Sequence, residues 1–310
     1  MIDTRLQDLP HGITLSCRTA GEPGRPVLLF LHGFPEAAFV WDELLEHFAR
    51  PEHGGYRCVA PNLRGYERSS APPDAAAYRA RHLVQDIAAL IAIESPRAPL
   101  AGLVAHDWGG AVAWSLANQE PQLLHRLAIL NSPHPGTFLR ELKSNPKQQA
   151  ASAYMNFLIR PDAERLLAED DYRRLWEFFL GMGAGQRADG TGHGWLTDDL
   201  KARYRAVWDH GLTGGLNYYR ASPLRPPQPG DPAASSIELP REMLTIAVPT
   251  LVLWGLGDTA LPPELVEGLD AYVPELTLQT WPDATHWLLH EHPRRVMDAL
   301  TQFLSAGAPQ

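Results

Sequence analysis

The sequence predicts an α/β protein with a mainly parallel sheet that is interrupted by a helical insertion. Short, continuous apolar runs occur in the first 133 residues and again after residue 245, and such runs are typical of strands buried on both faces of a parallel sheet. Between residues 134 and 245 the apolar residues instead have helical spacing. The 310 residues suffice for one large domain with an inserted subdomain. We therefore expect residues 1–133 and 246–310 to form the α/β core and residues 134–245 to form a helical cap.

Four strands and two helices are expected before the insertion. Val27 to Leu31 form the first strand, and a second apolar run lies within YRCVAPNLRGYERSS. HLVQDIAALIAI places its apolar residues on one side of a helix. LAGLVAHDWGGAVAWSLANQ has the pattern of a strand, a tight turn and a helix, and Leu127 to Leu130 form the next strand.

The insertion and the C-terminal part continue this pattern. QQAASAYMNFLI, AERLLAEDDYRRLWEFFLG and LTDDLKARYRAVWDH are expected to be amphipathic helices. The alternation of strands and helices then resumes with a buried strand from Thr250 to Trp254, a strand and loop in ELTLQTWPDATHW, and a closing helix in PRRVMDALTQFL. An α/β sheet interrupted by helices is the architecture that follows.

Composition narrows the classes of function. The net charge of −9 argues against nucleic acid and against an anionic membrane surface as partners. No apolar run is long enough to span a membrane, and the N-terminus lacks the features of a secretory signal, so a cytoplasmic location is expected. Cys17 and Cys58 are expected to be free, buried thiols. No metal and no cofactor are expected, because the sequence has neither HExxH nor a Cys/His cluster.

Asp107 is the candidate nucleophile. In open α/β sheets, ligand sites form at the carboxyl ends of the strands. LVAHDWGGAVAW places Asp107 there, with Ala105 two residues before it and Gly109 two residues after it. This is the spacing of a nucleophile elbow, with aspartate where hydrolases usually have serine. The alternative is that Asp107 caps the following helix, a position that aspartate favours.

Two further strand ends supply the partners that a nucleophile of this kind needs. Asp258 follows the Thr250–Trp254 strand, and His286 follows the next one. A nucleophile at such an elbow needs an acid and then a histidine further along the chain, and this is the order found here. Asn131 ends the strand before the insertion and cannot be the acid, because it cannot ionise. A surface turn for Asp258 and a purely structural role for His286 are the alternatives.

HGFPE, directly after the first strand, is the candidate oxyanion loop. The amides of Phe34 and Trp108 could together stabilise negative charge on an acyl oxygen. A cis bond before Pro35 would suit such a tight turn. An ordinary Gly-Pro turn is the alternative. Glu36 is expected at a helix start or as a buried polar group, and the sequence does not define its role.

These motifs carry a resemblance to a known family. HGFPE, NLRGYERSS, AHDWGG, WGLGD and DATHW resemble the motifs of α/β-hydrolases with an aspartate nucleophile. The resemblance covers almost the whole chain, including the insertion, and within the group the chain is most similar to soluble epoxide hydrolases. The resemblance implies the α/β-hydrolase fold with a cap domain. Three positions depart from it: Asn62 stands where many members have aspartate, and Glu67 and Thr285 stand where they have glycine.

The resemblance implies epoxide opening to a vicinal diol through a covalent ester on Asp107, which water activated by His286 then hydrolyses. It also implies that Tyr154, seven residues before a proline, and Tyr219, just before an arginine, donate the proton that the epoxide oxygen needs. Phe34, Trp108 and these two tyrosines would contact a small apolar epoxide.

Two other functions stay open on the sequence alone. Haloalkane and haloacetate dehalogenases use the same Asp-His-Asp chemistry, but Phe34 replaces the halide-binding asparagine that the first group has. The second group has arginines near the nucleophile, whereas the five residues directly after Asp107, Trp108 to Val112, include none. A non-catalytic ligand-binding protein on this scaffold is the third possibility. The protein is expected to be a monomer or a homodimer. Further apolar residues of the insertion are expected to line the pocket: Met155, Phe157, Leu158, Trp176 and Phe179.

Overall fold

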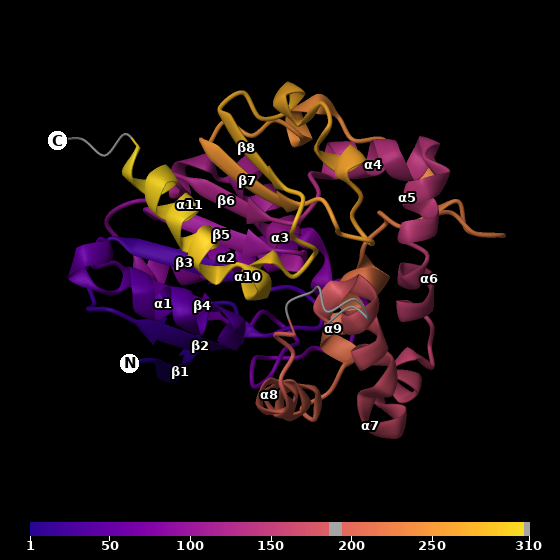
Figure 1. Cartoon of the computed structure of the whole chain (residues 1–310), viewed down its shortest axis with the longest axis horizontal. Helices are drawn as coiled ribbons and strands as arrows, with labels where there is room; N and C mark the ends of the chain where they lie inside the picture. Colours follow the sequence, from indigo (N-terminus) through magenta and orange to yellow (C-terminus); the bar gives the residue numbers. More distant parts are fainter. Residues whose placement is uncertain (186–193, 307–310) are drawn as a thin grey trace.

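The computed structural model describes residues 1–185 and 194–306, and it contains an eight-stranded sheet (Figure 1). The strand order is β1-β2-β4-β3-β5-β6-β7-β8. β2 is antiparallel to both β1 and β4, and β3 to β8 run parallel to one another. The strands are β1 (Asp3–Asp8), β2 (Thr14–Ala20), β3 (Val27–Leu31), β4 (Arg57–Pro61), β5 (Gly102–His106), β6 (Leu127–Leu130), β7 (Thr250–Gly255) and β8 (Leu276–Trp281).

Eleven α-helices lie in the described part of the chain. Four of them flank the core sheet: α1 (Asp42–Phe48), α2 (Ala80–Glu94), α3 (Trp108–Gln119) and α11 (Pro293–Ser305). The others are α4 (Pro135–Ser144), α5 (Pro146–Ala151), α6 (Tyr154–Leu158), α7 (Ala163–Phe179), α8 (Asp198–Trp208), α9 (Thr213–Ala221) and the short α10 (Leu288–Glu291). No helix among the described residues is long and apolar enough to cross a membrane.

The sheet divides two apolar layers because successive side chains of a strand point to opposite faces. In β3, Val27, Leu29 and Leu31 belong to the layer that packs on α2 and α3. Leu28 and Phe30 belong to the layer that packs on α1 and α11. This double burial explains the continuous apolar runs by which the parallel strands are predictable.

The sequence predicts the central strands better than the first two. β3 and β6 have the predicted bounds, and β7 extends one residue further, to Gly255. β1 and β2 were not predicted. β1 is an edge strand whose six residues are all at least partly exposed, so it has no apolar run. Cys17 and Cys58 are free and buried, as expected.

The chain between β6 and β7, which we call the insertion, holds α4 to α9. Figure 1 shows it at one end of the sheet rather than over a face. It is bound to the loop after β3, where Trp208 Nε1 donates a hydrogen bond of 2.7 Å to the carbonyl of Pro35. The predicted helix in AERLLAEDDYRRLWEFFLG is interrupted, because Asp170, Asp171 and Tyr172 have positive φ angles. The insertion therefore closes over the carboxyl ends of the strands.

Candidate active site

Asp107 lies at a sharp turn between β5 and α3. Its φ of 49° and ψ of −121° place a non-glycine residue in an unfavourable backbone region, as in nucleophile elbows. The turn brings α3 close to β3, and a Cβ at Gly109 would lie 2.4 Å from the carbonyl oxygen of Leu31. The Asp107 side chain makes no capping hydrogen bond to α3. Helix capping is therefore not its role.

His286 connects Asp107 to Asp258. His286 Nδ1 lies 2.7 Å from Asp258 Oδ2, and Nε2 lies 3.9 Å from Asp107 Oδ2. The three residues thus form a line in the order Asp107, His286 and Asp258, which follow β5, β8 and β7. The distance of 3.9 Å between Nε2 and Asp107 Oδ2 is longer than a hydrogen bond, so Nε2 faces the Asp107 carboxylate without a direct bond.

Asp258 is a buried group and not a surface turn, since it is only 5% exposed. Its Oδ1 accepts hydrogen bonds of 2.9 Å from the amides of Ala260 and Leu261. Its Oδ2 accepts a further bond of 2.7 Å from Asn131 Nδ2, and Asn131 Oδ1 accepts from the amide of Gly255. The sequence rejected Asn131 as the acid but did not reveal that its amide holds the acid in place.

The pKa of His286 is set by its neighbours. Burial lowers it, but the carboxylates of Asp258 and Asp107 outweigh the burial and raise the pKa to about 9. His286 is therefore protonated at neutral pH. An imidazolium cannot accept a proton, so His286 can act as a base only after it has lost this proton.

The loop after β3 holds the other oxygen of Asp107. The amide of Phe34 donates a hydrogen bond of 2.7 Å to Asp107 Oδ1, and the Phe34–Pro35 bond is cis. The approach requires glycine at position 33, because a Cβ there would lie 2.3 Å from that oxygen. Trp108 is the first residue of α3, so its amide has no acceptor within the helix.

One cavity joins Asp107 to the insertion. It has a volume of about 390 Å³, and its wall includes Asp107, Trp108, Tyr154 and Tyr219. The rings of Tyr154 and Tyr219 lie 6.2 Å apart, and Tyr219 packs edge-on against Trp108 at 5.0 Å. Burial raises the pKa of both phenols well above their usual range. Both tyrosines therefore remain proton donors at neutral pH.

The remaining pocket expectations fare unevenly. Of the five apolar residues expected to line the pocket, Met155 does so, whereas Phe157, Leu158, Trp176 and Phe179 do not. Trp176 and Phe179 instead pack with Tyr204 and Trp208 in an aromatic cluster. The Phe34 ring does not line the cavity either, since it packs edge-on against Tyr219 at 5.3 Å. Helical spacing identifies an apolar face but not which surface that face covers.

A buried polar network behind the site was not predicted. Glu36 is fully buried, and its carboxylate contacts His106 at 3.2 Å, His290 at 2.6 Å and the Tyr204 hydroxyl at 2.7 Å. Burial raises the pKa of Glu36, but the two histidines hold it well below its usual value. His106 Nε2 contacts the His286 carbonyl at 2.9 Å. The network therefore links the insertion to the backbone of the triad histidine.

Two of the three departures from the family motifs compensate each other. Asn62 Nδ2 donates a hydrogen bond of 2.7 Å to Glu67 Oε2. The amide at position 62 and the carboxylate at position 67 therefore satisfy each other. Thr285 is held by Glu291, which accepts from both its amide and its hydroxyl at 2.7 Å. Each departure is satisfied locally, and none displaces a residue of the triad.

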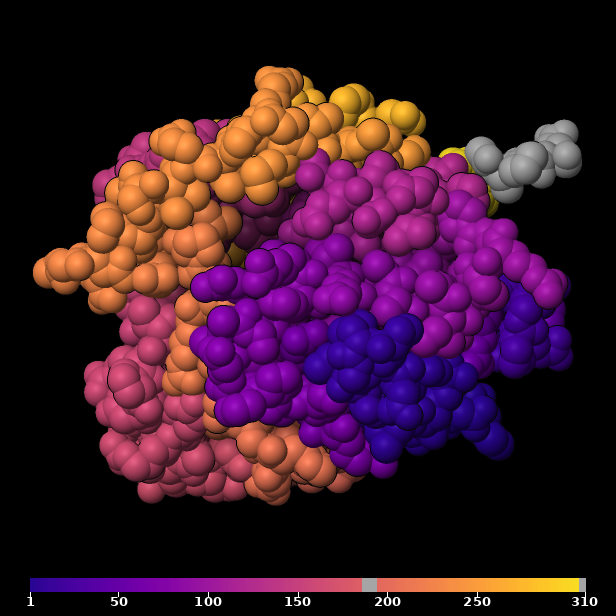
Figure 2. Space-filling view, turned by 180° about the vertical axis from the view of Figure 1, so that it is seen from behind, coloured from indigo at the N-terminus to yellow at the C-terminus, as the bar shows by residue number. Residues whose placement is uncertain are grey.

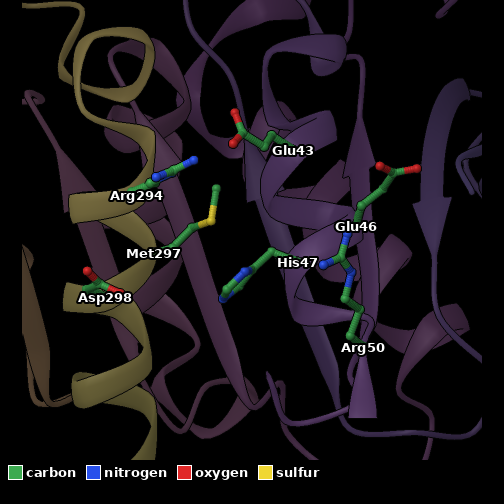
Figure 3. A pocket seen from close by; sticks show the side chains of 7 residues that line it. All are labelled: Glu43, Glu46, His47, Arg50, Arg294, Met297 and Asp298. Carbon is green, nitrogen blue, oxygen red and sulfur yellow. The ribbon is translucent and has the colours of Figure 1, made fainter. Parts of the chain in front are cut away.

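A second cavity, of about 350 Å³, lies between α1 and α11 (Figure 3). Its wall is charged and comprises Glu43, Glu46, His47, Arg50, Arg294, Met297 and Asp298. None of the triad residues contributes to it. Among the residues that the structure describes, no group of three or more His, Cys, Asp or Glu is placed to hold a metal ion. The candidate site is therefore the cavity at Asp107.

Comparison with known protein sequences identifies the family to which the chain belongs. Residues 26–293 match the family described as alpha/beta hydrolase fold. The chain is 32% identical to the AB hydrolase superfamily protein YfhM of Bacillus subtilis over 95% of each chain. It is 31% identical to Epoxide hydrolase 4 of Mus musculus, over 97% of this chain and 78% of that protein. The chain belongs to the α/β-hydrolase superfamily.

Solved structures give the same result at the level of fold. The epoxide hydrolase of Bacillus megaterium, in complex with an inhibitor, superposes with a TM-score of 0.85 over 97% of this chain and 99% of that one, at 28% identity. An epoxide hydrolase from metagenomes of hot environments has a TM-score of 0.81 over 99% and 100% of the chains, at 34% identity. Within the superfamily, the chain is thus similar to epoxide hydrolases.

Proposed function

We propose that this protein is an epoxide hydrolase, which opens an epoxide to a vicinal diol. The observation that carries the proposal is that Tyr154 and Tyr219 share one cavity with Asp107. An epoxide oxygen leaves carbon as an alkoxide and needs a proton donor, whereas a halide does not. Two neutral phenols, the buried Tyr219 and the partly buried Tyr154, lie in the cavity with the proposed carboxylate nucleophile and supply that donor.

In the first step, Asp107 Oδ2 attacks a ring carbon of the epoxide. The carboxylate is already anionic and needs no base. The carbon–oxygen bond of the ring breaks, and its electron pair takes a proton from one of the two tyrosines. The product is an ester of Asp107 that carries a β-hydroxyl group. Because the ester removes the charge beside His286, the imidazolium can release its proton and the tyrosinate can take one back, so that the phenol is restored and the imidazole can act as a base.

In the second step, water attacks the carbonyl carbon of this ester. His286 Nε2 takes the proton of the water, and the imidazolium that forms is oriented and stabilised by Asp258. The negative charge that develops on Asp107 Oδ1 is stabilised by the amides of Phe34 and Trp108. The ester bond then breaks, and the departing diol oxygen takes the proton that remains on the oxygen added from water. The carboxylate of Asp107 and the imidazolium of His286 are thereby restored.

The cavity wall does not favour the haloacetate alternative. Asp107 is the one carboxylate, and neither lysine nor arginine occurs among the described residues that line the cavity. An anionic substrate would therefore enter without a cation to bind it. The wall instead suits a small, uncharged, apolar epoxide. The relatives named as epoxide hydrolases support the same choice.

The proposal is tested by parallel assays of the purified protein. We expect styrene oxide to be converted to the diol, and we expect no halide release from haloalkanes or fluoroacetate. Asp107→Ala should abolish diol formation. Halide release without diol formation would establish the dehalogenase chemistry instead. Tight binding of styrene oxide with no turnover of any compound would indicate a binding protein.

A further inference from the structure

The active-site cavity extends along the whole of α3. It is lined by residues from the first turn of this helix to its last: Trp108, Ala111, Val112, Ser115, Asn118 and Gln119. The spacings of three and four place these residues on one face. A helix of this length spans about 18 Å. The cavity is therefore a channel whose inner end is Asp107 and whose far end is at the C-terminus of α3.

The opposite wall of the channel is apolar. It is formed by parts of α2, of α4 and of the chain after α9: Ala80, Leu83, Phe138, Leu224, Leu239, Met243, Leu244 and Ile246. Burial lowers the pKa of His134, which also lines the channel, to about 4, so it is neutral at pH 7. Beyond Asp107, the described wall thus carries no charge.

The far end of the channel opens to the surface. Gln119 is exposed, and Met243 is 56% exposed. Figure 2 shows the surface hollowed between the orange segment after α9 and the purple part of the core. Asn118 holds this opening in shape, since its Nδ2 donates hydrogen bonds of 2.9 Å to the carbonyls of Glu242 and Thr245.

We propose that the channel binds a straight, uncharged alkyl chain on the substrate, and that Ser115 is a specificity-determining residue within it. The preferred substrates are then terminal epoxides with long alkyl chains. This inference rests on the proposed function and deepens it. The physical reason is that each methylene that leaves water for the apolar wall stabilises the bound state.

Ser115 is the position at which the channel can be shortened. Its hydroxyl bonds back to the carbonyl of Ala111 in its own helix, at 3.1 Å, so it makes no bond to the opposite wall. A larger side chain there projects into the channel. Eight residues of helix separate Asp107 from Ser115, or roughly 12 Å. A carbon chain advances roughly 1.3 Å per atom for bonds of ~1.5 Å, so the inner part takes about nine carbons and the whole channel about fourteen.

The test is a series of 1,2-epoxyalkanes with increasing chain length. In the unmodified protein, kcat/KM should rise by up to about fourfold per methylene, which corresponds to ~0.8 kcal/mol per buried CH₂. The rise should end near about fourteen carbons. In Ser115→Phe it should end near about nine, and in Ser115→Leu between the two. The matched control is Ser144→Phe, because Ser144 bonds back to Arg140 in the same way but lies outside the channel on an exposed helix end.

A second readout does not depend on turnover. The affinity of 1,2-alkanediols for the same variants, measured by calorimetry, should show the same two limits in chain length. If short epoxides are opened but neither rate nor affinity depends on length, the channel proposal is overturned and the proposed function stands. If no epoxide is opened but diol affinity rises with length and Ser115→Leu shortens the rise, the channel proposal stands and the proposed function fails.

Discussion

The pKa of His286 should fall when the charge of Asp107 is removed. Asp107→Asn replaces the carboxylate by a neutral group of the same shape. Asp107 Oδ2 lies 3.9 Å from His286 Nε2, and at an effective dielectric constant of ~20 a charge pair at that distance is worth roughly 4 kcal/mol. This equals about three pKa units at ~1.36 kcal/mol per unit. Because Asp258 makes a larger contribution, we expect a fall of about one to three units from the value of about 9.

Nuclear magnetic resonance of the histidine rings measures this shift directly. The resonances of His286 can be assigned by comparison with His286→Gln, and the titration should run on both sides of neutral pH. Asp199→Asn is the matched control, since Asp199 is an exposed residue in α8 and its loss should leave the pKa of His286 unchanged. A pKa that stays near 9 in Asp107→Asn would refute the electrostatic reasoning.

The prediction bears on catalysis because esterification also removes the charge of Asp107. In the free protein His286 is protonated and cannot act as a base. Once Asp107 is an ester, the remaining carboxylate partner is Asp258, and the pKa of His286 should fall toward neutrality. Neutral His286 would then be available as a base only after the Asp107 ester has formed, which is the step in which it activates water. Activation of water before the ester forms would be disfavoured.

Further predictions address the other groups. His286→Gln should trap the ester, visible by mass spectrometry as an increase equal to one substrate; its absence with bound substrate would contradict covalent catalysis. Tyr219→Phe should slow ester formation by about tenfold or more in stopped-flow assays and affect ester hydrolysis less; equal effects would exclude it as the donor. Gly33→Ala should lower kcat/KM by about a hundredfold, because its Cβ would lie 2.3 Å from Asp107 Oδ1; an unchanged value would show that the loop can move. The pKa of His286 is raised from 6.5 to about 9, so its protonation stabilises the folded state by roughly 3 kcal/mol. This contribution should be complete below pH 6.5 and disappear as the pH rises through about 9. Urea unfolding of the unmodified protein and of His286→Gln measures it, and an identical pH dependence of the two proteins would contradict it.

The sequence predicts the ends of the central strands well for a physical reason. A strand buried on both faces needs an unbroken apolar run, and the run stops where the chain leaves the sheet. Asp107, Asp258 and His286 can therefore be placed at one edge of the sheet from the sequence alone. β1 could not be predicted, because an edge strand with exposed faces needs no such run.

Side-chain partners distant in sequence could not be predicted. Asn131 lies 127 residues from Asp258, and Glu36 lies 254 residues from His290. Nothing local to either residue specifies the contact. Each was visible only as a polar residue near a strand end, and its role depends on which strands are neighbours in the sheet. Because β6 pairs with β7, Asn131 at the end of β6 lies beside Asp258 after β7 and can hold that carboxylate by a hydrogen bond.

A comparison of the Asp107, Asp258 and Glu36 carboxylates supports Asp107 as the proposed nucleophile. Asp258 accepts from two amides, Asn131 and His286, and Glu36 is in contact with two histidines and a tyrosine. In the described structure, the Asp107 carboxylate accepts one hydrogen bond, from the Phe34 amide. Hydrogen bonds to a carboxylate stabilise its charge and reduce its tendency to form a new bond. The strained turn, which prevents Asp107 from capping α3, thus leaves one oxygen free of donors and directed at the cavity, and this is the oxygen that can attack carbon.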